Sequence, residues 1–432
     1  MLLHGTQQES SEGLMIGNLS CQGLKHRYGT PLIIYDQALI ESQAALFIQK
    51  FTSRTIQGEI AYASKAFSAV GLLSLMRTLG LSVDVSSSGE LYTAVLAGFS
   101  GDKIYYHGNN KLPEELDYAL DQGVSTFIID HRQEVNLLAA RLEQRKQRVN
   151  VYLRINPGIE AHTHEYIKTA KHDSKFGESI FTEDIYSIIE EILGCRWLDL
   201  QGFHSHIGSQ IFAESSFFKA AAEVLDFYVD VQKRFSCTLP SMDLGGGFGV
   251  YYTDGDVPIQ LESFLGNLMA YLETEIKKRG LAIKKVVLEP GRSLVCNAGS
   301  TLYTVGGTKT TYSGKNYCFV DGGMSDNPRP ALYQAAYEAT LANRMHEAMT
   351  THYTIAGKLC ESGDILIRDI MLPEARSGDL LLVSSTGAYT YSMASNYNRL
   401  LKPAVILVKD GISRLIVRRE TLDDLIRMDV VQ

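Results

Sequence analysis

The 432-residue sequence predicts an α/β fold: a (β/α)8 TIM barrel with a second, all-β domain of Greek-key-like type. Between residues 59 and 291, a short β-rich apolar run, a polar or glycine-containing loop and an amphipathic stretch follow one another repeatedly. Repeated βα units form parallel strands with right-handed crossovers, and eight units in roughly 230–250 residues match the size of a barrel. After residue 300 the helical period mostly stops and β-rich runs dominate.

Each barrel strand is predicted from an apolar, β-rich run that ends in polar or glycine residues. The candidate strands are 59–65, 82–87, 103–108, 126–130, 149–156, 200–208, 241–247 and 286–291. Between them, residues 69–79 and 215–234 carry apolar side chains at helical spacing. A doubly wound open sheet is the competing interpretation, but it usually has a GxGxxG turn after its first strand, and this sequence has none.

The β domain is predicted from alternating or β-rich runs separated by turn signals such as Asp410-Gly411. These runs are 301–305, 317–321, 352–356, 364–372, 379–385, 404–409 and 412–418. Residues 31–36 form one more strand, which we expect to join this domain. The predicted boundaries are therefore 37–298 for the barrel, and 1–36 plus 299–432 for the β domain.

Composition excludes several classes of protein. The net charge of −8 argues against nucleic acids and anionic membranes as partners. No apolar run approaches the roughly 20 residues that span a bilayer, and residues 1–13 carry no apolar signal core. The six cysteines are scattered without a CxxC pair, which is typical of reduced thiols in a cytoplasmic protein and argues against a disulfide framework or a zinc site.

Lys65 is the first candidate for chemistry, because it ends an apolar strand-like run, Glu59 to Lys65. An amine at such a position is costly to desolvate unless it is paired or reacts. An amine that loses its proton easily forms Schiff bases with aldehydes, including that of pyridoxal 5'-phosphate (PLP). The alternative is a strand-end lysine that simply reaches solvent.

The last two barrel strands end in residues that suit a phosphate group. Barrels often bind phosphate with the loops after strands seven and eight. Three consecutive glycines, Gly245, Gly246 and Gly247, let backbone N–H groups approach an anion closely. Gly291 and Arg292 at the next strand end add an N–H group and a guanidinium. A tight turn that needs positive φ is the alternative for the glycines alone.

Glu289 strengthens the interpretation of Lys65. Strands one and eight pair in a closed barrel, so Lys65 and Glu289 are expected to be neighbours. PLP requires a lysine for its aldehyde and an acidic partner for its pyridine nitrogen, where a carboxylate keeps the nitrogen protonated. A plain Lys–Glu ion pair would explain these two residues but not the adjacent phosphate loop.

Two pairs of histidines and one cysteine allow more than one interpretation. His204 and His206 are spaced to point the same way from a strand, and His162 and His164 offer a second pair. A metal site is one reading, but no carboxylate or cysteine cluster completes either pair, so stacking of His206 on a flat cofactor is favoured. From spacing alone, Cys360 is best read as an ordinary thiol in a turn.

The motifs together resemble the fold-type III PLP-dependent decarboxylases, the group that acts on ornithine, diaminopimelate and arginine, and within it the diaminopimelate branch. The resemblance covers nearly the whole chain, from Gly29 to Val408. It is carried by YASKAF (62–67), HGNNK (107–111), LRINPG (153–158), AHTHEYIKT (161–169), SKFG (174–177), HIGSQI (206–211), LGGGFG (244–249), EPGRS (289–293), VDGGMSDNPRPALY (320–333), CESGD (360–364) and GAYTYSMASNYN (387–398). AHTHEYIKT, DNPRPALY, CESGD and GAY with MASNYN are typical of the diaminopimelate branch.

The resemblance implies roles for individual residues. Lys65 corresponds to the lysine bound to the PLP aldehyde, His206 to the ring-stacking residue and Glu289 to the partner of the pyridine nitrogen. The phosphate is implied to lie among Ser209, Gly245, Gly246, Gly247, Gly291 and Arg292, with Tyr389 also reaching the cofactor. The far end of the substrate is implied to contact Arg292, Arg329, Tyr333, Glu361 and Tyr389. Cys360, supplied by the second subunit of a homodimer with shared active sites, corresponds to the residue that helps to reprotonate the substrate.

The implied reaction is decarboxylation of meso-2,6-diaminoheptanedioate to L-lysine and CO2, the last step of lysine biosynthesis by the diaminopimelate route. A zwitterionic far end needs a cation for its carboxylate and an anion for its ammonium, which Arg292, Arg329 and Glu361 supply. The alternatives are a decarboxylase of ornithine, arginine or a carboxylated polyamine, a fold-type III racemase, and a PLP-free regulatory homologue. A racemase would place an arginine where this chain has Glu289.

Overall fold

The computed structural model describes residues 1–159 and 174–431, and the chain forms two compact units. The barrel unit comprises Ala44–Gly249 and Pro258–Ser293, and the β unit comprises Met1–Gln43, Val250–Val257 and Leu294–Gln432. Residues 37–43, 250–257 and 294–298, which fall inside the predicted barrel range, cluster with the β unit. Each unit is described by itself.

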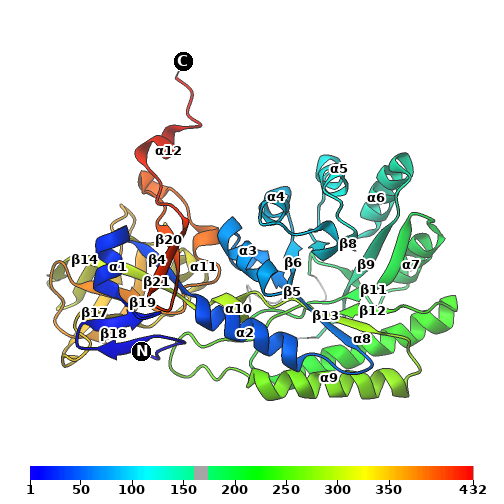
Figure 1. The fold of residues 1–432 in the computed structure, drawn as a ribbon, viewed down its shortest axis with the longest axis horizontal. Helices are drawn as coiled ribbons and strands as arrows, with labels where there is room; N and C mark the ends of the chain where they lie inside the picture. Colours follow the sequence, from blue (N-terminus) through cyan, green and yellow to red (C-terminus); the bar gives the residue numbers. More distant parts are fainter. Residues whose placement is uncertain (160–173, 432) are drawn as a thin grey trace. The chain divides into compact units, whose positions relative to one another are not determined.

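The barrel unit contains a closed ring of eight parallel strands, which confirms the predicted TIM barrel. Figure 1 shows the helices of this unit lying around its strands. In ring order the strands are β5 (Gln57–Ala63), β6 (Ser82–Val85), β7 (Ile104–Tyr106), β8 (Thr126–Ile129), β9 (Val149–Asn156), β11 (Leu198–His204), β12 (Ser241–Asp243) and β13 (Lys285–Leu288). The ring closes where β13 pairs with β5, so that Leu288 lies opposite Ile60. A two-residue strand, β10 (Glu178–Ser179), pairs with β9 outside the ring.

Helices precede, connect and follow the barrel strands. They are α2 (Gln37–Lys50), which leads into β5, then α3 (Val70–Thr78), α4 (Ser88–Leu96), α5 (Pro113–Asp121), α6 (Arg132–Arg145), α7 (Asp184–Gly194), α8 (Glu214–Phe235), α9 (Leu261–Lys278) and the short α10 (Arg292–Val295). In α8, Phe217, Val224 and Val231 recur every seven residues and are buried, so one face of the helix packs inward. Inside the barrel, Ala61, Tyr105, Ile128, Tyr152 and Val287 form a buried apolar cluster, and the interior is a packed core.

The β unit contains a mixed sheet, which confirms the predicted separate β domain. Its strand order is β18 (Ile365–Leu372), β17 (Thr351–Ala356), β15 (Asn316–Val320), β14 (Gly299–Thr310), β4 (Leu32–Asp36), β20 (Ala404–Lys409) and β21 (Ile412–Val417), and β19 (Leu380–Val383) pairs with both β14 and β16 (Ala339–Leu341). As expected, the N-terminal strand β4 joins this sheet, antiparallel to β14 and parallel to β20.

Smaller elements complete the β unit. A three-stranded sheet precedes β4 and consists of β1 (Gln8–Ser10), β2 (Gly13–Ile16) and β3 (Leu19–Ser20), and the unit also contains α1 (Cys21–Tyr28), α11 (Arg329–Tyr333) and α12 (Leu422–Ile426). Leu14, Leu32, Leu302, Leu382 and Ile406 belong to one buried cluster, which joins the small sheet to the large one. Among the described residues, no helix has the length and apolar character needed to cross a membrane.

Candidate active site

The carboxyl ends of the barrel strands border a cavity of about 290 Å³. It is lined by Lys65, Asp84, Ser86, His107, Gly108, Asn109, Arg154, Lys175, Phe176, His204, His206 and Glu289. Parallel strands in a barrel present all their carboxyl ends on one face, which is why these residues, distant in sequence, meet. Lys65, His206 and Glu289, which the sequence assigned to one cofactor, thus line one cavity.

Lys65 follows β5 on a single 3-10 turn, Ser64–Ala66. The predicted strand ran to residue 65, whereas the observed strand ends at Ala63, and Lys65 itself is an exposed residue at the cavity. The lysine is thus accessible, as a strand-end lysine can be, whereas its neighbours Ala63, Ser64 and Ala66 are buried. The Ala63 N–H group donates to the Pro290 carbonyl at 3.2 Å, which ties the lysine turn to the end of strand β13.

Glu289 lies between two imidazole rings. Its Oε1 is 2.7 Å from His107 Nε2, and its Oε2 is 3.1 Å from His204 Nε2. The side chains of all three residues are at least nine-tenths buried. The two histidine rings pack edge to face, with their centroids 4.9 Å apart. No predicted role for His107 or for this triad came from the sequence.

The histidines decide the charge of the glutamate. Burial by itself raises the pKa of Glu289, but His107 and His204 outweigh it and hold that pKa well below its usual range. Burial lowers the pKa of His204 to about 4, against the opposing effect of Glu289. Near neutral pH the cavity therefore holds an ionised Glu289 that accepts a hydrogen bond from a neutral His204 ring.

The same three residues form a possible metal-ligand set. The ligand atoms of His107, His204 and Glu289 all lie within 4.8 Å of one another. Two imidazoles and one carboxylate are ligand types that zinc accepts. The sequence paired His204 with His206 instead, but β11 ends at His204 and His206 lies in the following loop, so the two do not share a strand. His162 and His164 lie outside the described residues.

His206 contacts the glycine turn. Its Nδ1 accepts a hydrogen bond from the Gly246 N–H group at 3.2 Å. Burial is the largest of the effects that hold the pKa of His206 well below 6.5, followed by Lys65 and Arg154. A neutral ring with an accepting Nδ1 is consistent with both observations.

The turn Gly245–Gly247 requires glycine for two reasons. Gly245 and Gly247 have φ values of 65° and 110°, which L side chains rarely adopt. A Cβ atom on Gly246 would also collide with the Glu289 carbonyl oxygen, and one on Gly247 with that of Gly208. The Gly245 N–H group donates to Asp243 Oδ1 at 2.8 Å, and Gly246 donates to His206. Two of the three N–H groups predicted to hold phosphate are thus engaged within the protein.

Ser209 and Arg292 meet beside this turn. Ser209 Oγ accepts hydrogen bonds from Arg292 Nε at 3.2 Å and Nη2 at 3.1 Å. Arg292 is buried and begins α10, directly after Gly291. Gly291 in turn packs tightly on Ala63, since a Cβ atom there would lie 3.0 Å from the alanine Cβ. The turn and these residues offer a compact set of donors for an anion.

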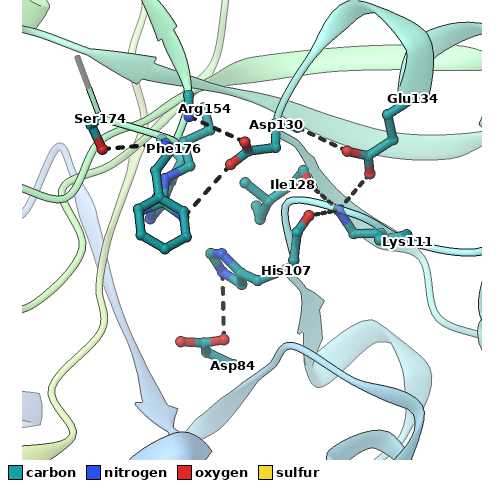
Figure 2. Close-up of polar contacts among 12 residues, drawn as sticks. Asp84, His107, Lys111, Ile128, Asp130, Glu134, Arg154, Ser174 and Phe176 are labelled. Atoms are coloured by element: carbon teal, nitrogen blue, oxygen red, sulfur yellow. Dashed lines mark hydrogen bonds and ion pairs between the residues drawn. The ribbon is translucent and has the colours of Figure 1, made fainter. Parts of the chain in front are cut away.

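A second polar network supports the cavity wall, and the sequence did not reveal it (Figure 2). Arg154 lies 3.7 Å from Asp130 and 4.4 Å above the Phe176 ring. Asp130 Oδ2 also accepts from the Gly177 N–H group at 3.2 Å. The motifs LRINPG and SKFG, which contain Arg154 and Phe176–Gly177, were visible signals, but only the fold shows that they join.

Lys111 of the HGNNK motif connects two barrel loops. Its Nζ donates to the carbonyls of Gly108 at 2.8 Å and Ile128 at 2.7 Å, and it pairs with the Glu134 carboxylate. Glu134 Oε2 accepts from the Asp130 N–H group at 3.0 Å. This buried pair therefore fixes the loop that carries His107 and the loop that carries Asp130 (Figure 2).

The remaining predicted residues lie in the β unit. Arg329 is buried, and the rings of Tyr252, Tyr333 and Tyr389 surround its guanidinium at 5.6–5.9 Å. Its Nε donates to Tyr337 OH at 2.9 Å. Among the described residues no other hydrogen bond of the guanidinium is found, which leaves both Nη groups as donors for a planar carboxylate.

Cys360 and Glu361 occupy an exposed turn between β17 and β18. The Cys360 N–H group donates to Asn398 Oδ1 at 2.7 Å. Glu361 Oε1 accepts from the Gly363 N–H group at 3.2 Å. Both side chains are open to a further partner in the single chain.

The chain resembles proteins of one family along its whole length. Residues 37–296 match the family model described as the pyridoxal binding domain of the pyridoxal-dependent decarboxylases. The diaminopimelate decarboxylase of Bacillus subtilis is 46% identical, over 100% of this chain and 98% of that protein. The enzyme of the same name from Halalkalibacterium halodurans is 44% identical, over the same shares of the two chains.

The chain belongs to the diaminopimelate decarboxylase family. A crystal structure of diaminopimelate decarboxylase from M. jannaschii in co-complex with L-lysine has a TM-score of 0.93 and is 31% identical, covering 100% of this chain and 99% of that one. The chain is therefore an enzyme, a decarboxylase of a pyridoxal-dependent family.

The cavity fits the cofactor class that the diaminopimelate decarboxylase family uses. A pyridoxal group requires an amine, a polar group for its ring nitrogen and a place for an anion. Lys65 and the ionised Glu289 line one cavity, and the glycine turn beside it bonds directly to His206. Ser209, Arg292 and the N–H group of Gly247, for which no acceptor is found within the described ranges, supply donors for the anion.

Proposed function

We propose that this protein removes CO2 from meso-2,6-diaminoheptanedioate and releases L-lysine, with pyridoxal 5'-phosphate held in the barrel cavity. The observation that supports this most strongly is the convergence of Lys65 and Glu289 on one cavity from paired strands. The 46% identity to a diaminopimelate decarboxylase supports the choice of substrate.

The cofactor, when bound, supplies an electron sink for the electron pair that remains when CO2 leaves. Lys65 would supply the amine for its aldehyde and His206 a flat face for its ring. Glu289, kept ionised by His107 and His204, would hold a proton at the ring nitrogen. Ser209, Gly247, Gly291 and Arg292 would bind its phosphate, and Gly245 and Gly246 would shape that turn through Asp243 and His206. Tyr389 would complete the cofactor contacts.

The substrate carries a second amino-acid group that must be held while the first one reacts. Arg329, with both Nη groups available, suits the distal carboxylate, and Glu361 suits the distal ammonium. Arg292, Tyr333 and Tyr389 would contact the same end. Fixing this end orients the bond between Cα and the departing carboxylate.

Decarboxylation breaks the Cα–carboxylate bond and forms a Cα–H bond, so one proton must reach Cα. The Sγ of the partner subunit's Cys360 would help to supply that proton in a homodimer with shared sites. Cys360 and Glu361 are exposed in the single chain, which is compatible with a role at a second subunit's site.

The direct experiment incubates purified protein and PLP with meso-diaminopimelate, ornithine or arginine, and measures CO2 and the amine products. We expect CO2 and L-lysine from diaminopimelate and little turnover of the others. Lys65→Ala should abolish the visible absorbance of bound PLP and lower kcat by about 10⁴-fold or more. Lys175→Ala, which alters another lysine of the same cavity, is the matched control and should retain the absorbance.

Efficient turnover of ornithine without that of diaminopimelate would contradict the proposed substrate. A colourless protein that takes up no PLP would favour the regulatory reading.

The His107–His204–Glu289 set supports a second candidate, a metal-dependent enzyme. Metal analysis and treatment with a chelator decide between the two. We expect activity to depend on added PLP and to survive chelation. Loss of activity on chelation, restored by Zn²⁺ in the absence of PLP, would establish the metal reading instead.

A further inference from the structure

Three turns that are distant in sequence join in the β unit. They comprise residues 322–327, 357–364 and 395–398, and we call them the turn cluster. The Lys358 N–H group donates to the Gly322 carbonyl at 3.1 Å, and the Ser395 N–H group donates to the Ser325 carbonyl at 3.0 Å. Three of the motifs that are typical of the diaminopimelate branch thus contribute to a single structure.

Asp364 is the centre of this cluster. Its carboxylate accepts hydrogen bonds from the Met324 N–H group at 2.6 Å and from the Leu359 N–H group at 2.9 Å. One buried carboxylate therefore binds the backbones of the first two turns. Gly323 and Gly357 flank it closely, and a Cβ atom on either residue would collide with its oxygens.

Asn398 ties the third turn to the second. Its Oδ1 accepts the Cys360 N–H group at 2.7 Å. Its φ of 50° lies in the left-handed region, where asparagine is favoured over most residues. The side chain that holds Cys360 is thus presented by a backbone conformation suited to asparagine or glycine.

The same cluster leads directly to Arg329. The Asp326 and Asn327 N–H groups both donate to the Gly323 carbonyl, at 3.0 and 3.1 Å. Asn327 Oδ1 then accepts the Arg329 N–H group at 3.3 Å, at the start of α11. Met324, whose N–H group is held by Asp364, therefore lies in the turn that leads into α11, the helix that begins at Arg329.

A carboxylate in this setting carries a cost in stability. Burial raises the pKa of Asp364, and none of the ion pairs found among the described residues includes it. A buried acidic group without a cation is costly to a fold. Such a cost is typical of functional positions.

We propose that Asp364 and Asn398 are positioning residues that set Cys360 and Glu361 in register with the Arg329 helix. This inference rests on the proposed function, in which Arg329 and Glu361 hold opposite charges of a substrate amino-acid group. Asp364 fixes both the turn that precedes Arg329 and the turn that carries Cys360 and Glu361. Asn398 fixes the tip of the turn that carries Cys360. In the homodimer, displacement of one turn would disturb the substrate site of its own subunit and that of the partner.

The test compares four variants of the PLP-loaded full chain. Asn398→Gly removes the acceptor and keeps the left-handed backbone accessible, whereas Asn398→Asp keeps the acceptor. Asp364→Asn replaces one acceptor oxygen with a donor. Asp369→Asn is the matched control, since Asp369 lies on β18 with a side chain that is 74% exposed.

Asn398→Gly and Asp364→Asn should lower kcat/KM for diaminopimelate roughly 10- to 100-fold, because misplacement by about 1 Å can cost 100-fold. Bound PLP and its absorbance should stay at the wild-type level in both. Asn398→Asp and Asp369→Asn should behave as wild type. The alkylation rate of Cys360, followed by mass spectrometry, should change in the first two variants, while that of Cys195 in the barrel unit should not.

Wild-type kinetics and an unchanged Cys360 alkylation rate in Asn398→Gly and Asp364→Asn would overturn the inference and leave the proposed function intact. Loss of PLP or unfolding of Asp364→Asn, with Asn398→Gly unaffected, would assign Asp364 a structural role and also overturn it. If the wild type forms no lysine, the proposed function fails. The alkylation rates of Cys360 then test by themselves whether Asp364 and Asn398 position the turn.

Discussion

Glu289 in the barrel unit and Asp364 in the β unit are both buried carboxylates, yet their surroundings shift their pKa values in opposite directions. Burial raises the pKa of each. Two imidazoles outweigh that effect at Glu289 and lower its pKa well below the usual range. Within the described part of the chain, Asp364 accepts hydrogen bonds only from the backbone N–H groups of Met324 and Leu359, and its pKa stays raised.

The comparison shows that the partner, and not burial, decides what a buried acid can do. Side-chain partners keep Glu289 charged, as a group must be to hold a proton on a ligand. Hydrogen bonds from backbone N–H groups orient the Asp364 carboxylate but do not offset the cost of burying its charge. Such a group suits the task of holding a turn in place. The barrel cavity is thus organised by charge, and the turn cluster by backbone geometry.

The first prediction removes the charge at Glu289. Glu289→Gln keeps the shape and the acceptor oxygen but removes the negative charge, so we expect kcat to fall roughly 10²- to 10³-fold. The fall should be accompanied by a change in the visible spectrum of bound PLP. Steady-state kinetics and absorbance spectra of the variant provide the measurement.

A double-mutant cycle with His204→Gln supplies the control for this prediction. If His204 acts through Glu289, the two changes together should cost much less than the sum of the single effects. Additive losses would show that the histidine acts independently, and the explanation of the low pKa of Glu289 would then be wrong.

The second prediction concerns the buried pair of Lys111 and Glu134. Lys111→Met leaves a buried glutamate without its cation, so we expect the free energy of unfolding to fall by about 3–5 kcal/mol. The matched control is Arg148→Ala, which breaks the exposed pair of Arg148 and Asp199 in the same unit and should cost about 0–1 kcal/mol. Urea denaturation of both variants gives the comparison, and equal losses would contradict it.

The third prediction tests the β unit through pH. Burial, with smaller contributions from Asp321 and Asp364, raises the pKa of Asp326 to about 7, whereas an aspartate in an unfolded chain titrates near about 3.9. The folded chain therefore holds a proton that the unfolded chain releases between these values. The stability that this proton contributes is present below about pH 4 and is lost as the pH rises toward 7.

Asp326→Asn removes this titration and keeps an acceptor oxygen for the Gly323 N–H group. The difference in unfolding free energy, variant minus wild type, should therefore increase between pH 4 and 7. Its upper limit is about 4 kcal/mol, from roughly 1.4 kcal/mol per pKa unit over about three units. Urea denaturation at pH 5, 6, 7 and 8 provides the measurement, and a difference that decreases with pH would contradict the sign.

The sequence predicted the elements well where hydrophobic pattern alone decides them. All eight barrel strands appeared, although β12 ends at Asp243 and β13 at Leu288, earlier than the apolar and glycine pattern suggested. The strand predicted over residues 200–208 runs too far, because the hydrophobic pattern does not show that β11 stops at His204. In the β unit, β16 and the sheet of β1 to β3 were not predicted, since strands of two to four residues carry little periodicity.

Other features depended on partners that no local pattern contains. His107 and Lys111 stood out only as members of the HGNNK motif, and Asp130 only as the last residue of a predicted strand. Their contacts could not be predicted, because their partners come from other loops. The availability of the glycine N–H groups could not be predicted either, since His206 and Asp243 occupy two of them.

The sequence by itself determined the barrel, the separate β domain and the family, because strand periodicity and contiguous motifs are local properties of a chain. It also identified Lys65, Glu289 and the glycine turn, because ring closure follows from counting strands. Only the tertiary structure decided the charge of Glu289, the exposure of Lys65 and the joining of three turns around Asp364. Those features arise from burial and from contacts between distant segments, which exist only once the chain is folded.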